Sequence, residues 1–101
     1  MGMRRKARIV ALKTLYEIDT VGHDPGATLK RLLAVAALPP LAAEFARELV
    51  TGVLEHRPGI DEIIRRLAPA WPVNQIPPVD RNILRLAIFE ILHHNKAPVK
   101  V

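Results

Sequence analysis

Apolar residues recur along most of this 101-residue chain with the spacing of an α-helix. Between residues 7 and 18 they fall at i, i+3, i+4, i+8 and i+11, with Thr14 at i+7, and the same template repeats between residues 42 and 53. No stretch alternates apolar and polar residues over the length of a strand. Proline and glycine interrupt the pattern at intervals that suit helices. The sequence therefore predicts an all-α protein, a compact bundle of about five helices at residues 4–20, 25–37, 41–57, 60–68 and 78–94.

Residues suited to helix ends support these boundaries. Asp24 is expected to cap the second helix, with Pro25 in its first turn, where the missing N–H costs nothing. Asp61 and Glu62 are expected in the first turn of the fourth helix, and Asp80 in that of the fifth. Acidic residues at these positions complement the helix dipole.

The first helix departs from this rule, because its opening turns are basic. The chain has a net charge of +5, and residues 1–13 hold five cations and no acid, whereas residues 14–101 hold ten of each sign. The five cations are Arg4, Arg5, Lys6, Arg8 and Lys13. Cations are unfavourable at the positive end of a helix dipole. The stretch therefore indicates a polyanionic partner, most often a nucleic acid, and the alternative interpretation is a frayed, solvated basic terminus.

A second apolar face is expected on the same helix. Ile9, Leu12 and Tyr16 lie nearly opposite the stripe that starts at Ala7. A helix that is apolar on two sides is usually packed from both, so we expect Ile9 and Leu12 to be covered. Tyr16 is suited to a different role, because its ring can stack on a base at the rim of a basic surface.

Helix 78–94 is apolar almost all round and must be covered on most of its sides. Its apolar residues are Val79, Ile83, Leu84, Leu86, Ala87, Ile88, Phe89, Ile91 and Leu92. The helices before it can cover only two of its faces. We therefore expect further covering material, either additional chain or a partner subunit.

The residues that carry most enzyme chemistry are missing or badly spaced. The chain has no cysteine, no serine and no glycine-rich phosphate loop. His93 and His94 are adjacent and diverge by about 100° on a helix, so they cannot both face one metal ion. We expect no catalytic residue, no metal and no cofactor.

No apolar run reaches the roughly 20 residues that span a bilayer, so the chain is expected to be cytoplasmic, without membrane contact.

Three blocks of sequence resemble the NusB family of transcription antitermination factors. They are Arg-Arg-Lys-Ala-Arg at residues 4–8, Phe-Ala-Arg-Glu-Leu-Val-Thr-Gly-Val-Leu-Glu at 45–55, and Pro-Pro-Val-Asp-Arg-Asn-Ile-Leu-Arg-Leu-Ala at 77–87, followed by Ala-Pro-Val-Lys-Val at 97–101. The blocks come in the family's order and span essentially the whole chain, which is interpreted as a single domain over residues 1–101.

The resemblance implies a non-enzymatic function in transcription. It implies binding of boxA-type single-stranded RNA, a heterodimer with the small-subunit ribosomal protein NusE, and joint action on RNA polymerase to suppress termination in ribosomal RNA operons. By position, Arg4, Arg5, Lys6 and Arg8 match the family's RNA-binding segment, and Tyr16 matches a tyrosine near the RNA. Asp80 and Arg81 match the region where the ribosomal protein docks.

The sequence ends earlier than the family pattern, which continues for about two more helices. Three explanations stay open: a fragment, a truncated gene product, or a chain that forms a homodimer through the uncovered helix 78–94. An alternative function is also open, the N-terminal NusB-like, RNA-positioning domain of a ribosomal RNA cytosine methyltransferase. A helix-turn-helix DNA reader is disfavoured, because the excess charge lies on the first helix and on no later recognition helix.

The basic segment also predicts how RNA affinity depends on salt. Guanidinium groups bind phosphate oxygens and stay charged at any cellular pH. Neutralising single-stranded phosphates gives a slope of about −0.7 per contact, hence about −3 for this segment. Such contacts give affinity and little sequence choice, so we expect the chain alone to bind RNA weakly and NusE to add affinity and selectivity.

Overall fold

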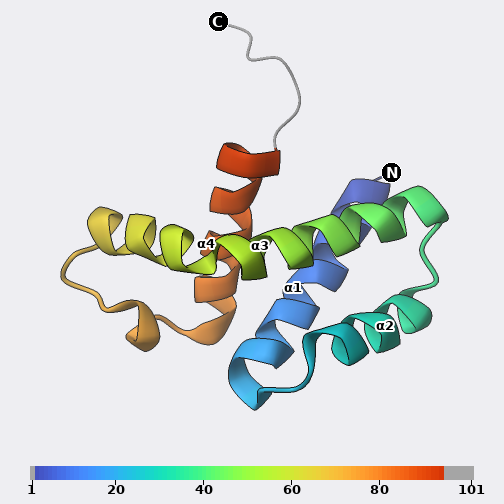
Figure 1. Cartoon of the computed structure of the whole chain (residues 1–101), viewed down its shortest axis with the longest axis horizontal. Helices are drawn as coiled ribbons and strands as arrows, with labels where there is room; N and C mark the ends of the chain where they lie inside the picture. Colours follow the sequence, from blue (N-terminus) through green and yellow to red (C-terminus); the bar gives the residue numbers. More distant parts are fainter. Residues whose placement is uncertain (1, 95–101) are drawn as a thin grey trace, which may run out of the picture.

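The computed structural model describes residues 2–94, and every element in this range is helical (Figure 1). Four α-helices follow one another: α1 (Met3–Val21), α2 (Pro25–Ala36), α3 (Pro40–Leu67) and α4 (Pro78–Phe89). A short 3-10 turn, η1 (Val73–Gln75), precedes α4, and a π-helical turn, η2 (Glu90–His94), continues it. The prediction of an all-α fold is confirmed, and the segment 97–101 lies outside the described residues.

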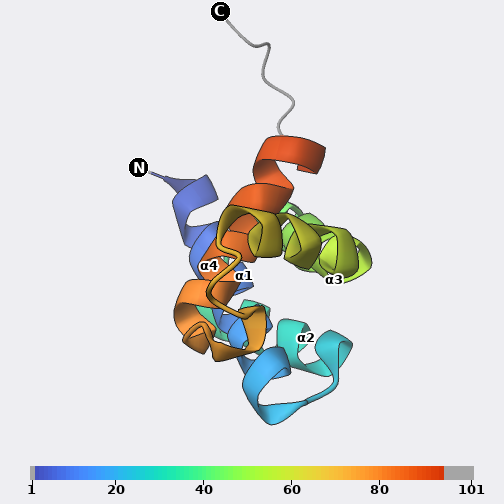
Figure 2. The same ribbon diagram turned by 90° about the vertical axis from the view of Figure 1, so that its left-hand side faces the viewer.

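Three helices contact one another to form the core. α3 crosses both α1 and α4, which also pack together, and α2 lies mainly on α1. Figure 2 shows α3 on one side of α1 and α4, with α2 near the far end of α1. Buried apolar side chains from α1, α3, η1 and α4 form one cluster, centred on Ala11, Leu49, Val53, Ile60 and Phe89.

The apolar stripe of α1 is buried as the sequence predicts, but the opposite side is not. Ala7 and Ala11 are fully buried, whereas Ile9 is 44% exposed and Tyr16 is 41% exposed. The expectation that α1 is packed from both sides is therefore wrong for Ile9 in the described structure, and only Leu12 is partly buried there. The small alanines of the buried stripe allow close helix approach, so the neighbouring helices gather on that side.

The two helices expected at 41–57 and 60–68 are one helix, because α3 runs through Pro58 without a break. Proline removes one backbone hydrogen bond and crowds the preceding turn, which makes an interruption the usual prediction. Here the residues after Pro58 bury Ile60 and Ile64, which are 1% and 2% exposed, and this burial holds the helix together. Asp61 and Glu62 consequently lie inside the last two turns of α3 and not in a first turn.

The other helix starts are confirmed. The Oδ2 atom of Asp24 accepts a hydrogen bond of 2.9 Å from the backbone N–H of Ala27, and Pro25 is the first residue of α2. Asp80 lies in the first turn of α4. These local signals determine the starts of α2 and α4 without help from tertiary contacts.

α4 crosses α3 at Gly52, where the two helices are very close. A Cβ atom added to Gly52 would lie 2.0 Å from Cζ of Phe89, too near for any real contact. Glycine in a helix costs about 1 kcal/mol relative to alanine. The close crossing explains why this position has no side chain.

α4 buries polar side chains beside the apolar Leu86 and Phe89. It buries polar Arg81, Asn82 and Arg85 towards the protein interior. Large apolar side chains remain exposed on its other sides and along η2, namely Val79, Ile83, Leu84, Ile91 and Leu92. The prediction that this helix is left incompletely covered is therefore confirmed for the described residues.

Candidate nucleic-acid interface

The basic segment forms the exposed first turns of α1. Arg4, Arg5 and Lys6 are exposed, and the first turn of the helix contains no acidic residue. Gly2 precedes the helix without a side-chain cap, so the helix end adds its own partial positive charge to the cations. Cationic side chains and helix dipole together favour an anion at this end of the molecule.

Arg8 differs from the other three cations because it pairs with Glu90. Its Nε and Nη2 atoms donate to the Glu90 carboxylate at 2.8 and 2.9 Å. These hydrogen bonds raise the pKa of Arg8, so the guanidinium stays charged while part of its field is neutralised. The two residues are 82 positions apart, which is why the sequence counts Arg8 as equal to its neighbours.

An aromatic ring lies beneath the arginines. The guanidinium carbon of Arg4 is 4.7 Å from the centroid of the Phe45 ring, and that of Arg8 is 5.5 Å away. A cation over a ring is attracted to its π-face. Phe45 is only 8% exposed and belongs to the core, so it positions these arginines relative to the rigid body of the protein.

Tyr16 lies in an open groove between α1, α2 and the start of α4. The groove has a volume of about 720 Å³. Leu12 and Val79 give it an apolar wall next to the tyrosine ring, and Glu17, His23 and Arg31 stand at its edge. Hydrogen bonds from Arg31 and then from His23 lower the pKa of Glu17. The groove therefore places an aromatic ring next to a set of hydrogen-bonded polar side chains.

The two residues matched to partner docking have different surroundings. Asp80 is exposed, whereas Arg81 is only 9% exposed and points into the protein. The Nη1 atom of Arg81 donates to the backbone carbonyl oxygens of Val73 and Ile76 at 3.3 and 3.1 Å. Arg81 thereby fixes η1 against the start of α4, and only Asp80 of the pair is available at the surface.

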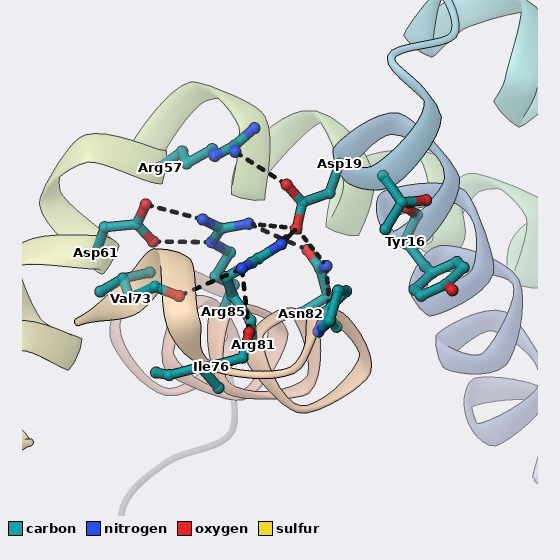
Figure 3. A network of polar contacts seen from close by, with 11 residues as sticks. Tyr16, Asp19, Arg57, Asp61, Val73, Ile76, Arg81, Asn82 and Arg85 are labelled. Atoms are coloured by element: carbon teal, nitrogen blue, oxygen red, sulfur yellow. Dashed lines mark hydrogen bonds and ion pairs between the residues drawn. The ribbon is translucent and has the colours of Figure 1, made fainter. Parts of the chain in front are cut away.

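A buried polar network, drawn in Figure 3, surrounds Asp19 at the end of α1. Its Oδ2 atom accepts from Arg81 at 2.8 Å, from Asn82 at 2.9 Å and from Arg85 at 3.2 Å. Arg85 also forms a two-pronged pair with Asp61 of α3, at 2.8 and 3.0 Å. The network therefore joins α1, α3 and α4.

The network keeps Asp19 ionised. Burial by itself would raise the pKa of Asp19, but hydrogen bonds from Asn82 and Arg81, with the charges of Arg81 and Arg85, lower it below its ordinary value. The residue pattern used above did not predict this cluster. One signal was present, since Arg81 and Arg85 are a like-charge i, i+4 pair in a mostly apolar helix, and such a pair is destabilising unless counter-charges lie nearby.

The described residues contain neither a metal-binding cluster nor a membrane-spanning helix. No group of three or more His, Cys, Asp or Glu side chains in residues 2–94 is arranged to hold a metal ion. Within the same part of the chain, no helix has the length and apolarity needed to cross a membrane.

Comparison with known proteins decides the family. The sequence model of the NusB family matches residues 5–101, nearly the full chain. The chain belongs to the NusB family. This confirms the resemblance read from the three sequence blocks.

Individual relatives agree with this assignment. The transcription antitermination protein NusB of Dehalococcoides mccartyi (strain ATCC BAA-2266 / KCTC 15142 / 195) is 49% identical over 98 residues, covering 97% of this chain and 68% of the relative. NusB of Roseiflexus sp. (strain RS-1) is 44% identical over 100 residues, covering 97% of this chain and 70% of the relative. The relatives are longer, as the sequence predicts, and they are named as transcription antitermination proteins, which confirms the prediction of a non-enzymatic factor.

Two solved structures share the fold. A chain in the "Crystal Structure of a Plectonemic RNA Supercoil" superposes with a TM-score of 0.88 at 32% identity, covering 96% of this chain and 70% of that one. The solution structure of NusB from Aquifex aeolicus gives a TM-score of 0.74 at 32% identity, covering 91% of this chain and 63% of the other.

Proposed function

We propose that this chain is an RNA-binding transcription antitermination factor. It binds boxA-type single-stranded RNA through Arg4, Arg5, Lys6 and Arg8 and acts in the cytoplasm with NusE and RNA polymerase to suppress termination in ribosomal RNA operons. The observation that carries the proposal is the exposed basic first turn of α1 on a body that is otherwise electrically neutral. The names of the relatives and the RNA in one related crystal support it.

The geometry lowers the expected salt dependence of RNA binding. Arg4, Arg5 and Lys6 have no carboxylate partner among the described residues, whereas Arg8 shares its charge with Glu90. Three available cations at about −0.7 each contribute about −2 to the slope, in place of the −3 expected for this segment from the sequence. Base selection needs other groups, and the ring of Tyr16 in its groove is suited to stack on a base.

Exposed groups at the junction of α1 and α4 support docking of NusE there. Tyr16 and Val79 line the same groove, Ile83 is 46% exposed one turn further along α4, and Asp80 adds a negative charge beside them. Apolar anchors rimmed by charge are typical of a protein interface. Arg81 acts here through the backbone it fixes and not through the partner.

Adding NusE is expected to improve both affinity and selectivity. Alone, the chain should bind boxA and scrambled RNA with similar, weak affinity, because its contacts are mainly to phosphates. With NusE, boxA affinity should rise at least tenfold, which corresponds to about 1.4 kcal/mol. Fluorescence anisotropy with both RNAs, with and without NusE, measures this, and an unchanged boxA affinity would contradict the partnership.

The methyltransferase interpretation is less well supported. The relatives described above are named antitermination proteins, and they exceed this chain by about a third of their length. A cofactor-binding methyltransferase domain would add far more residues than that difference. The observations therefore favour the antitermination function.

We also propose that α4 can mediate a homodimer through its exposed apolar side. Leu84 and Ile91 are 40% and 68% exposed and lie on one side of the helix, and the buried pairs of Arg81 and Arg85 prevent α4 from rotating to hide them. Sedimentation should show dimers of the wild type at tens of micromolar and monomers of Leu84→Asp. Val35→Asp, at an exposed site of α2, is the matched control and should leave the dimer intact. A wild type that is monomeric throughout would refute the interface.

A further inference from the structure

We propose a second oxyanion site, which binds a phosphate group of the RNA at the opposite end of α1 from the basic turn. It is a pocket of about 490 Å³ formed by the end of α1, the second half of α3, η1 and the start of α4. This inference deepens the proposed function and rests on it, because the ligand is a phosphate of the same RNA strand.

The pocket has a local excess of positive charge, although the net charge of residues 14–101 is zero. Four arginines line it: Arg57, Arg65, Arg81 and Arg85. Two carboxylates, Asp19 and Asp61, balance only half of them. A concave site with excess charge of one sign concentrates ligands of the opposite sign.

The charges are arranged in layers, with the anions at the base and the cations at the mouth. The side chains of Asp19 and Asp61 are 10% and 16% exposed and are held by the buried guanidinium groups of Arg81 and Arg85. At the mouth, Arg57 is 37% exposed and Arg65 is 55% exposed. An incoming anion therefore meets guanidinium groups first, and the carboxylates are covered by their own partners.

Arg57 makes the fewest hydrogen bonds of these four arginines. Among the described residues it makes one hydrogen bond, a long one of 3.4 Å to Oδ1 of Asp19, while the Oδ2 atom takes the three shorter bonds described above. Figure 3 shows Arg57 reaching from α3 towards Asp19, on the opposite side of the network from Val73 and Ile76. The remaining N–H groups of Arg57 can donate to a ligand without breaking the network.

Arg65 and Asn74 can complete the site. Arg65 pairs with Glu62 of its own helix at 2.8 Å, and both side chains are about half exposed. Exposed pairs of this kind are worth at most about 1 kcal/mol, so an oxyanion can compete for Arg65. Asn74 lines the pocket from η1 and has an amide N–H to donate. Forked guanidinium donors and an amide match the oxygens of a phosphate.

The position of the pocket suits a strand that also contacts the basic turn. Asp19 follows Tyr16 by three residues on α1, which is about 5 Å along the helix axis, and Arg4 precedes Tyr16 by about 18 Å in the other direction. A phosphate bound at Arg57 would therefore extend the contact beyond the groove that holds Tyr16. Free inorganic phosphate has the same chemistry, and the experiment separates the two sources.

The test compares Arg57→Gln with Arg47→Gln. Arg47 is a matched control, because it is on the same helix, is 53% exposed and makes an ion pair of the same length, 3.4 Å, with Glu44. For Arg57→Gln the slope of log affinity for boxA RNA against log salt should become shallower by about 0.7, one phosphate contact, with about a fivefold loss at 0.1 M salt. Arg47→Gln should match the wild type. Asp19 keeps its three shorter bonds in Arg57→Gln, and thermal melting checks that the fold is intact.

A second arm follows the side-chain Nε–H resonances of the arginines by NMR while inorganic phosphate is added. A saturable shift at Arg57 together with the change in slope supports the site. A shift at Arg57 with an unchanged slope means that the pocket binds free anion only and overturns the RNA assignment. No shift and no change in slope overturn the pocket itself. If the wild type binds no RNA at all, the proposed function fails, and the phosphate titration still decides whether the pocket binds an oxyanion.

Discussion

RNA affinity of the chain should fall about a hundredfold at 0.1 M salt when Arg4, Arg5, Lys6 and Arg8 are all replaced by glutamine. Three of these cations are free to neutralise phosphates, and each contributes about 0.7 to the slope of log affinity against log salt. The slope should therefore become shallower by about 2. Arg8 adds less than the others, because Glu90 already holds its guanidinium. Anisotropy titrations of boxA RNA at several salt concentrations measure both quantities.

A control variant with the same net charge shows whether RNA binding depends on where the cations lie or only on how many there are. Lys30, Arg47 and Arg66 are exposed cations of α2 and α3 outside the groove of Tyr16, and replacing all three with glutamine removes three positive charges. This control is compared with the variant that replaces only the three available cations of the basic turn. If the basic turn is the RNA site, this control should keep most of the wild-type affinity. Equal losses in the two variants would show that binding follows overall charge, and the RNA surface would then be wrongly placed.

Replacing Asp19 with asparagine should lower the free energy of unfolding by about 3–5 kcal/mol, the usual cost of leaving buried charges unpaired. Asparagine keeps the shape of the side chain but removes the negative charge that Arg81 and Arg85 share. Arg85 retains the carboxylate of Asp61, whereas Arg81 is left with uncharged acceptors such as the backbone carbonyls of Val73 and Ile76. Small domains are stable by about 5–15 kcal/mol, so the loss should be plain in urea denaturation.

The effect of this substitution should depend on pH in a defined direction. The network lowers the pKa of Asp19 in the folded state, so its ionised form stabilises the fold above the pKa of the unfolded chain, about 3.9. The difference between wild type and Asp19→Asn should be full at pH 7 and shrink as the pH falls below about 4 towards the lowered pKa. Glu44→Gln, in an exposed pair with Arg47, should change stability by less than about 1 kcal/mol. A pH-independent difference would contradict the role of the Asp19 charge.

The sequence identified the basic surface at the start of α1 but not the tertiary contacts that its arginines make. The cluster of Arg4, Arg5 and Lys6 is visible as a run of cations, and the structure leaves them exposed. The partner of Arg8 and the ring beneath Arg4 come from positions 90 and 45, and nothing in the spacing indicates these contacts. Arg81 illustrates the same limit, because a residue matched to a docking surface is oriented by Asp19, 62 positions away.

The sequence by itself determined the helical class, the buried faces of α1 and α3, the start of α2 at Asp24 and the concentration of charge at the amino end. These features follow from period, capping and local charge, which act over a few residues. Only the tertiary structure decided that α3 continues through Pro58, that α4 turns its arginines inward, and that Arg57 stands at the mouth of a charged pocket. Each of these depends on burial or on pairing between residues distant in the chain, and such contacts outweigh local preference once the helices pack.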